Sequence, residues 1–154
     1  EKFNIVELIN EVIRKCKVML DDRKIDIKFE HEPEVQVFAD SFYIEQVVTN
    51  YFTNAIKHAK EVNGIRRIEV KITNNEETEK VRVSVFNTGD NISENAISKI
   101  WGRFYKEDTS RNREDGGTGI GLALVKAIMT NYKNDYGVVN KENGVEFYFE
   151  LDKE

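Results

Sequence analysis

The sequence predicts a two-layer α/β fold, in which a mixed and mostly antiparallel sheet packs against three main helices. Three stretches carry apolar residues at three- and four-residue steps, the spacing of an amphipathic helix, while several shorter runs alternate apolar and polar residues as strands do. The 154 residues match the length of one ordinary domain, and the chain has neither an internal repeat nor an interdomain linker. We therefore expect a single domain over residues 1–154, with the helices on one face of the sheet.

The N-terminal part is predicted to hold one helix and two strands. Apolar residues from Val6 to Leu20 recur at helical spacing, so we expect a helix over residues 6–20 that faces the core. Alternation over 25–29 and again over 35–37 predicts two strands around a turn that contains the only proline of the chain.

A long second helix is predicted to follow these strands. Asp40 or Ser41 can cap its N-terminus, and the helical spacing continues to about Lys60. Alternating runs at 68–72 and 81–85 flank a polar segment, which predicts an antiparallel hairpin.

The C-terminal part is predicted to contain a long loop between two helices. A short helix is expected over 93–101 and a third main helix over 119–132, while residues 102–118 show no periodicity. A loop of that length in a compact domain is usually functional or mobile. Two final strands are predicted on either side of Asn143 and Gly144.

The composition excludes several classes of protein. Charged residues make up 33% and hydrophobic residues 40% of the chain, a mixture typical of a soluble globular protein. The formal net charge is -5 and the basic residues are interspersed with acidic ones, which disfavours a nucleic-acid ligand. No run approaches the roughly 20 apolar residues of a membrane-spanning helix, so we expect no direct membrane insertion. The single cysteine, Cys16, lies at an apolar core position and suits a reducing, cytoplasmic location.

A polar stripe on the second predicted helix is the first candidate site. At about 100° per residue, Asn50, Asn54 and Lys57 fall within roughly 60° of one another, and His58 borders the apolar face. An asparagine carbonyl is a neutral ligand suited to Mg²⁺, and a neighbouring lysine can meet the charge of a phosphate. Taken alone, the stripe is better explained as a solvated helix face. The apolar face of this helix consists of Ile44, Val48, Tyr51, Ala55 and Ala59.

A run of four glycines in six residues opens the third main helix. Gly116, Gly117, Gly119 and Gly121 let the backbone approach a ligand closely, and the free amides at a helix start attract anions. The spacing matches neither the P-loop, which needs a lysine after its last glycine, nor the dinucleotide fingerprint. We therefore expect a phosphate-binding loop, with a flexible hinge as the alternative.

The stretch 46–58 resembles the N box of the sensor histidine kinase catalytic domain. That domain belongs to the wider group that includes gyrase B, Hsp90 and MutL, and it has the Bergerat fold. In this family the second asparagine of the N box binds Mg²⁺ and the lysine binds phosphate, which implies these roles for Asn54 and Lys57. The resemblance spans almost the whole chain.

Three further stretches resemble the remaining boxes in the family's order. The turn-like segment 87–92 resembles the G1 box, which takes the adenine amino group; 100–106 resembles the F box at the start of the mobile ATP lid; 117–122 resembles the G2 box that closes the lid. The nucleotide contacts that the resemblance implies come from Asn50, Asn54, Lys57, His58, Asn87, Gly89, Ile92, Phe104, Lys106, Gly117, Thr118, Gly119, Gly121 and Leu122.

The chain departs from the family pattern at the G1 box. Asn87 stands where the family has an aspartate, and Asn91 stands where it has a second glycine. A neutral amide gives the adenine amino group a weaker hydrogen bond than a carboxylate does, which lowers the expected affinity for ATP. His58 replaces the usual tyrosine, and Lys106 replaces the frequent arginine and meets phosphate as a point charge. The ending, 136–149, resembles a variant found in some Gram-positive sensor kinases.

The resemblance implies transfer of the γ-phosphate of ATP to a histidine on the dimerisation domain of the same kinase, in a two-component system with a response regulator. Asn50, Lys57 and Lys106 are the residues expected at the reacting phosphate, with Mg²⁺ held by Asn54. A neutral imidazole is already nucleophilic, which explains an asparagine at position 50, where the ATP hydrolases of the wider group place a carboxylate.

The acceptor histidine is expected to lie outside this chain. Neither His31 nor His58 lies in an acceptor-type helix motif, and His31 is expected at the surface. The chain also begins without methionine, so we expect it to be part of a longer protein that carries the acceptor domain and the membrane anchor elsewhere. The chain alone should then bind nucleotide but not phosphorylate itself.

Two alternative functions fit parts of the pattern. A serine kinase of the anti-sigma type shares the fold and uses a carboxylate base near the N box, and Asn50 argues against it. A degenerate regulator that binds a partner and no nucleotide is motivated by Asn87 and Asn91. Titration of ADP in the presence of Mg²⁺ distinguishes these possibilities.

Overall fold

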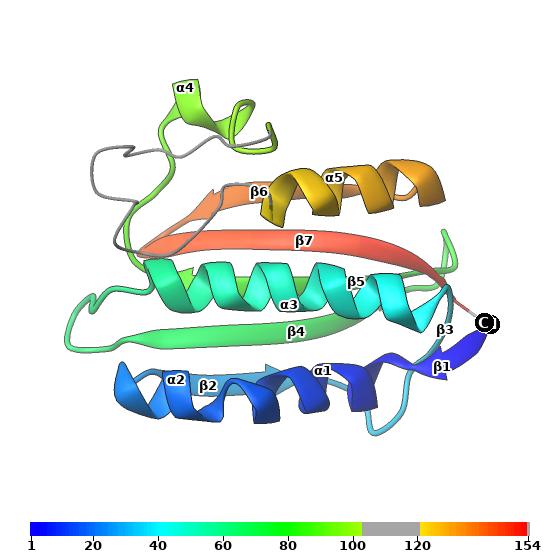
Figure 1. Cartoon of the computed structure of the whole chain (residues 1–154), viewed down its shortest axis with the longest axis horizontal. Helices are drawn as coiled ribbons and strands as arrows, with labels where there is room; N and C mark the ends of the chain where they lie inside the picture. Colours follow the sequence, from blue (N-terminus) through cyan, green and yellow to red (C-terminus); the bar gives the residue numbers. More distant parts are fainter. Residues whose placement is uncertain (103–120, 154) are drawn as a thin grey trace.

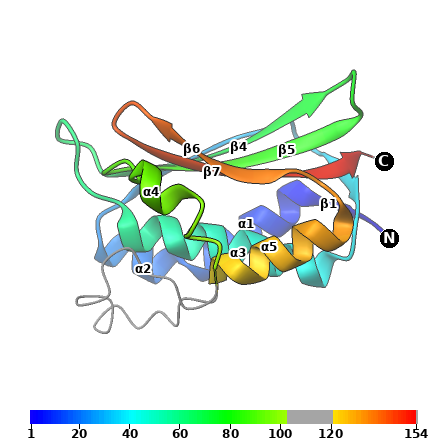
Figure 2. The same ribbon diagram turned by 90° about the horizontal axis from the view of Figure 1, so that it is seen from above.

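The computed structural model describes residues 1–102 and 121–153, and these form a sheet covered by helices on one face. Figure 2 shows the two layers edge on, with α1, α3 and α5 side by side under the sheet. In chain order the elements are β1 (Lys2–Asn4), α1 (Ile5–Lys15), α2 (Lys17–Asp22), β2 (Asp26–Glu30), β3 (Gln36–Phe38), α3 (Ser41–His58), β4 (Arg67–Asn75), β5 (Lys80–Thr88), α4 (Glu94–Ile97), α5 (Gly121–Tyr132), β6 (Tyr136–Lys141) and β7 (Gly144–Lys153).

The sheet has seven strands within the described residues, in the order β1-β3-β7-β5-β4-β2, with β6 also paired to β7. The pairing is antiparallel throughout, except that β2 and β4 run parallel. The predicted two-layer fold with a mixed, mostly antiparallel sheet is therefore confirmed. The edge strand β1 has only three residues, too few for an alternating pattern to be recognised, and it was not predicted.

The first predicted helix is divided into two in the structure. The prediction of one helix over 6–20 was wrong at Cys16, which ends α1 and precedes α2 with φ -96° and ψ 5°. The bend turns Leu20 into the core, where it is 4% exposed, while Val18 is 79% exposed. Cys16 itself is buried, as predicted, and burial raises the pKa of its thiol.

The strands on either side of the proline turn do not pair with each other. β2 lies at one edge of the sheet beside β4, and β3 lies near the other edge between β1 and β7. The chain therefore crosses the whole sheet between these two strands. The exposed His31, which lies on this crossing, is at the surface as predicted.

Helix α3 lies at the centre of the helical layer, between α1 and α5 (Figure 1). Asp40 caps it, because its carboxylate accepts a hydrogen bond from the backbone N–H of Phe42 at 3.0 Å. Its predicted apolar face is fully buried against the sheet: Ile44, Val48, Tyr51, Ala55 and Ala59. Burial of the larger of these side chains, such as Ile44 and Val48, stabilises a fold by about 1.5–3 kcal/mol each. The opposite, polar side of α3 is thus fixed in position by its apolar face.

The two remaining helices differ slightly from the prediction. α4 is shorter than the predicted 93–101, although Ser93 caps it as a helix start should. α5 is described from Gly121, and the predicted start at residue 119 lies outside the described residues. Among the described residues, no helix is both long and apolar enough to cross a membrane.

Candidate functional site

The polar side of α3 carries the predicted stripe. Asn50, Asn54 and Lys57 are all partly exposed, as expected for side chains at a helix edge. The amide of Asn50 donates to the backbone carbonyl of Gln46 at 2.8 Å, which fixes the direction of its side-chain oxygen. Within the described part of the chain, the side chain of Asn54 makes no hydrogen bond, so its amide is free to bind a ligand.

The start of α5 lies directly against this stripe. A Cβ atom placed on Gly121 would lie 2.8 Å from Oδ1 of Asn50, closer than two such atoms can approach. Only glycine therefore fits at position 121 without moving Asn50. The contact brings the last residue of the glycine run to within one helical turn of Asn54 along α3, as a shared phosphate site requires.

The end of β5 meets α3 at the other end of the stripe. Gly89 has φ +148°, and a Cβ atom on it would lie 3.0 Å from the backbone oxygen of His58. The backbone N–H of Lys60 also donates to the carbonyl of Thr88 at 2.9 Å. The backbone at 88–89 is therefore packed against the C-terminal end of α3, and the close approach requires glycine at position 89.

Asn87 presents an unpaired acceptor in this region. Its side chain is only 1% exposed, and its amide nitrogen donates to the carbonyl of Thr88 at 3.0 Å. Within the described residues, its side-chain oxygen is buried and has no hydrogen-bond partner. A buried acceptor without a partner costs about 1–3 kcal/mol. A ligand that brings an N–H donor to this oxygen recovers that free energy.

Arg23 holds the end of α3 and was not predicted from the sequence. Its guanidinium donates to the carbonyl of Lys57 at 3.1 Å and to that of Ala59 at 3.2 Å. A cation at a helix C-terminus is favourable because the unpaired carbonyls carry partial negative charge. No local signal marks Arg23, since its partners are more than thirty residues away in the chain.

An aromatic cluster fixes the residues that follow α4. The ring of Trp101 lies 5.0 Å from that of Tyr136, 5.9 Å from that of Phe147 and 6.5 Å from that of Tyr51. Tyr51 donates to the carbonyl of Tyr148 at 3.0 Å, and burial raises its pKa well above its ordinary value. Trp101 is therefore anchored to α3 and to the β6–β7 hairpin just before the segment 103–120.

Five predicted contacts lie outside the described residues: Phe104, Lys106, Gly117, Thr118 and Gly119. Among the others, Gly121 lies against Asn50 and Gly89 lies against His58, both on α3, whereas Ile92 pairs with Asn140 on β6. Leu122 packs against the core beside them. In the described part of the chain, no three His, Cys, Asp or Glu side chains are grouped to hold a metal ion.

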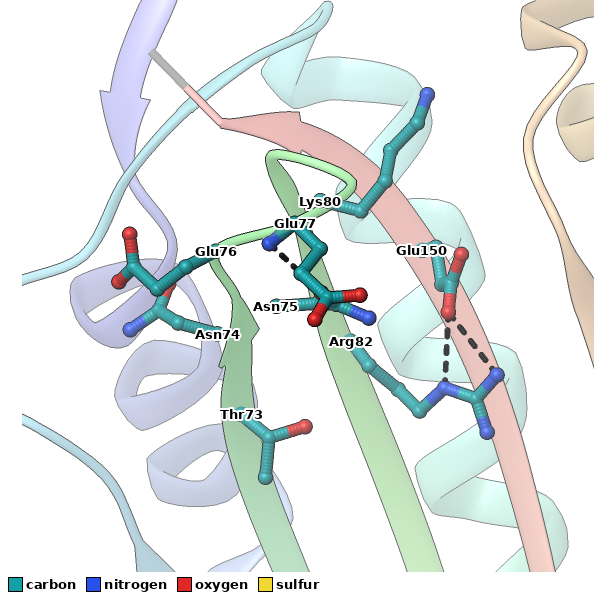
Figure 3. A pocket seen from close by; sticks show the side chains of 8 residues that line it. All are labelled: Thr73, Asn74, Asn75, Glu76, Glu77, Lys80, Arg82 and Glu150. Atoms are coloured by element: carbon teal, nitrogen blue, oxygen red, sulfur yellow. Dashed lines mark hydrogen bonds and ion pairs between the residues drawn. The ribbon is translucent and has the colours of Figure 1, made fainter.

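A hollow on the described surface lies elsewhere. Its volume is about 560 Å³, and it lies on the sheet face that no helix covers, between the β4–β5 turn and β7 (Figure 3). Arg82 lines it and donates one hydrogen bond to the carboxylate of Glu150 at 3.0 Å, and the two side chains also form an ion pair at 2.9 Å. None of the predicted site residues lines this hollow. The close approaches around α3 are the better guide to the functional site, because they bring predicted site residues from separate elements together.

Comparison with known proteins identifies relatives of the whole described fold. A sequence model of the family "Histidine kinase-, DNA gyrase B-, and HSP90-like ATPase" matches residues 39–154. The sensor protein VanSB of Enterococcus faecalis is 32% identical over 115 residues, which are 75% of this chain and 25% of VanSB. The chain thus spans about a quarter of that relative.

Solved structures give the same result. The nucleotide-free catalytic domain of histidine kinase ThkA superposes with a TM-score of 0.85 at 34% identity, covering 99% of this chain and 95% of ThkA's domain. The structure of ThkA in complex with the response regulator protein TrrA matches with a TM-score of 0.79 at 30% identity, covering 100% of this chain and 42% of the other.

Proposed function

The chain belongs to the family of histidine kinase-, DNA gyrase B- and HSP90-like ATPases, and from this premise we propose that it binds Mg-ATP and donates the γ-phosphate to a histidine. The acceptor is the histidine of the dimerisation domain of the same kinase, in a two-component system. One observation supports this proposal most directly: α3 contacts the glycine start of α5 at Asn50 and the glycine end of β5 at His58. The segments proposed to bind the base and the phosphates therefore contact the same helix, α3.

The base is proposed to bind at the end of β5. The buried, unpaired oxygen of Asn87 accepts a hydrogen bond from the exocyclic amino group of adenine, and Gly89 leaves room beside the α3 terminus. Because the Asn87 amide nitrogen is engaged by Thr88, the side chain presents an acceptor and not a donor. This orientation favours adenine over guanine, which offers an oxygen at the same position.

The phosphates are proposed to lie between α3 and the start of α5. Asn54 supplies an amide oxygen to Mg²⁺, which neutralises phosphate charge, and Lys57 adds a positive charge one turn later. The helix start at Gly121 adds partial positive charge from free backbone amides. Lys106 and the glycines of the segment 103–120 complete the site in this proposal. Asn50, hydrogen-bonded and neutral, orients groups without activating water.

The transfer itself moves one phosphoryl group. The bond between the γ-phosphorus and the bridging oxygen breaks, a bond forms between phosphorus and the imidazole nitrogen, and ADP leaves. The phosphohistidine then passes its group to a response regulator; the ThkA–TrrA complex shows such a pair for a relative. We place this activity in the cytoplasm, where ATP and the reduced Cys16 thiol are both expected.

Calorimetric titration with ADP tests the proposal. The wild-type chain should bind ADP more tightly with Mg²⁺ than with EDTA. The Asn54→Ala variant should lose about tenfold in affinity with Mg²⁺ and nothing with EDTA, since only the metal contact is removed. Asn74→Ala is the matched control, because Asn74 is exposed on β4 away from the site. A wild-type chain that binds no ADP would instead favour the degenerate regulator.

A further inference from the structure

The segment after Asn87 is fastened to the tip of the β6–β7 hairpin by side-chain amides. The side-chain oxygen of Asn140 accepts from the backbone N–H of Ile92 at 2.9 Å, and its amide nitrogen donates to the carbonyl of Ile92 at 2.9 Å. One amide side chain thus pairs with both polar groups of a single residue 48 positions away. This reciprocal pair fixes the backbone of Ile92 as a strand partner would.

Asn91 also binds the tip of the β6–β7 hairpin. Its amide nitrogen donates to the carbonyl of Lys141 at 3.0 Å and to that of Gly144 at 2.8 Å. These carbonyls lie on either side of the hairpin turn, so Asn91 bridges the two strands at their tip. A glycine, which the family pattern has at this position, cannot make either bond because it has no side chain.

The contact continues toward the proposed base site. The backbone N–H of Gly89 donates to the carbonyl of Asn143 at 2.9 Å. Gly144 approaches so closely that a Cβ atom on it would lie 2.1 Å from the backbone oxygen of Asn87. The hairpin tip therefore contacts the segment at Asn87, Gly89, Asn91 and Ile92, leaving little freedom between the base-binding residue and the end of the segment.

We propose that Asn91 and Asn140 are positioning residues, which pre-organise the segment 87–92 for the nucleotide base. This inference rests on the proposed nucleotide site. A loop that is ordered before binding loses less conformational entropy when the ligand arrives, so its affinity is higher than that of a free loop with the same contacts. The two amides thereby offset part of the affinity lost by the exchange of aspartate for Asn87.

The test compares ADP with inosine diphosphate, which carries an oxygen in place of the adenine amino group. Calorimetry is run on wild type, Asn140→Ala, Asn91→Ala and the control Asn74→Ala. The wild type should prefer ADP. Each of the two site variants should bind ADP about tenfold more weakly, the loss expected for two hydrogen bonds. The affinity for inosine diphosphate, which cannot donate a hydrogen bond to the Asn87 oxygen from an amino group, should fall much less. The preference for ADP should therefore shrink in both variants.

Amide hydrogen exchange reports the release of the segment directly. The Ile92 amide should exchange faster in Asn140→Ala than in wild type, because its acceptor is gone. Asn140→Asp keeps that acceptor and should restore part of the ADP affinity, and it replaces Asn140→Ala if the latter does not fold.

The outcomes separate the two proposals. Unchanged ADP affinity in both alanine variants overturns the positioning role and leaves the nucleotide site intact. Equal weakening of ADP and inosine diphosphate also overturns it, since a general structural defect lowers both alike. Absence of ADP binding by the wild type overturns the proposed function and this inference with it.

Discussion

The two ends of β5 are held in different ways. At the Lys80 end the contacts are made by long side chains near solvent: the ammonium of Lys80 lies 2.5 Å from the side-chain oxygen of Asn134 and also pairs with Asp152. The neighbouring turn is closed by Asn75, whose side-chain oxygen accepts from two backbone N–H groups. The strand there is also paired with β4 and β7, but the side chains of Lys80 and Asp152 can rotate without disturbing that pairing.

At the Thr88 end the backbone itself makes the contacts. Gly89 lies against the terminus of α3, and Gly144 lies against the carbonyl of Asn87. There a side chain cannot relieve a clash by rotating, because the opposing atoms belong to paired strands and a helix end. The difference indicates that the backbone of β5 is held more tightly at the Thr88 end, where a ligand is proposed to bind. It is held less tightly at the exposed Lys80 end.

Gly144→Ala should lower the free energy of unfolding more than Tyr51→Phe or Lys80→Met does. A smaller loss would contradict the difference between the two ends of β5. The new Cβ would lie 2.1 Å from a backbone oxygen of the paired strand β5. We expect the free energy of unfolding to fall by about 3 kcal/mol or more, as for severe overpacking. Urea denaturation measures the loss. Gly137→Ala is the matched control: its Cβ would meet the end of the Tyr148 side chain at 2.7 Å, which can move, so we expect about 1 kcal/mol.

Tyr51→Phe should give an intermediate effect, at the contact between α3 and β7. The variant loses the hydrogen bond from Tyr51 to the carbonyl of Tyr148, which should lower the free energy of unfolding by about 1 kcal/mol near pH 8. Because burial raises the pKa of Tyr51, the unfolded tyrosine loses its proton first, and wild-type stability falls as the pH rises above about 10. The difference in the free energy of unfolding between wild type and variant should then decrease. A gap that stays constant up to pH 11 would contradict this role of burial.

Lys80→Met should give the smallest effect, at the exposed end of β5. The side chain of Asp152 is 59% exposed, and exposed ion pairs contribute about 0.2–1 kcal/mol. We expect a loss at the low end of that range in urea denaturation, and less at high salt because counterions screen the pair. A loss as large as that of Gly144→Ala would mean that the two ends of the strand are not held differently.

Periodicity alone was enough to predict the layers. α3, α5 and the pair β4 and β5 follow strong apolar patterns, and the structure has them close to the predicted positions. The prediction failed at the bend at Cys16 and at the three-residue strand β1. It also named no strand partners, so it did not show that β2 and β3 lie far apart in the sheet. A local pattern reports which face of an element is buried, and it contains no information on the element that covers that face.

The candidate site shows the same division. The sequence by itself determined the candidate residue types, because Asn54, Lys57 and the glycines stand in the order of the boxes that they resemble. Tertiary structure alone decided that Gly121 rests on Asn50, that Arg23 holds the end of α3 and that Asn140 pairs with Ile92. The physical reason is range: helix and strand patterns arise from neighbours within a few residues, whereas these contacts depend on how the chain brings distant segments together.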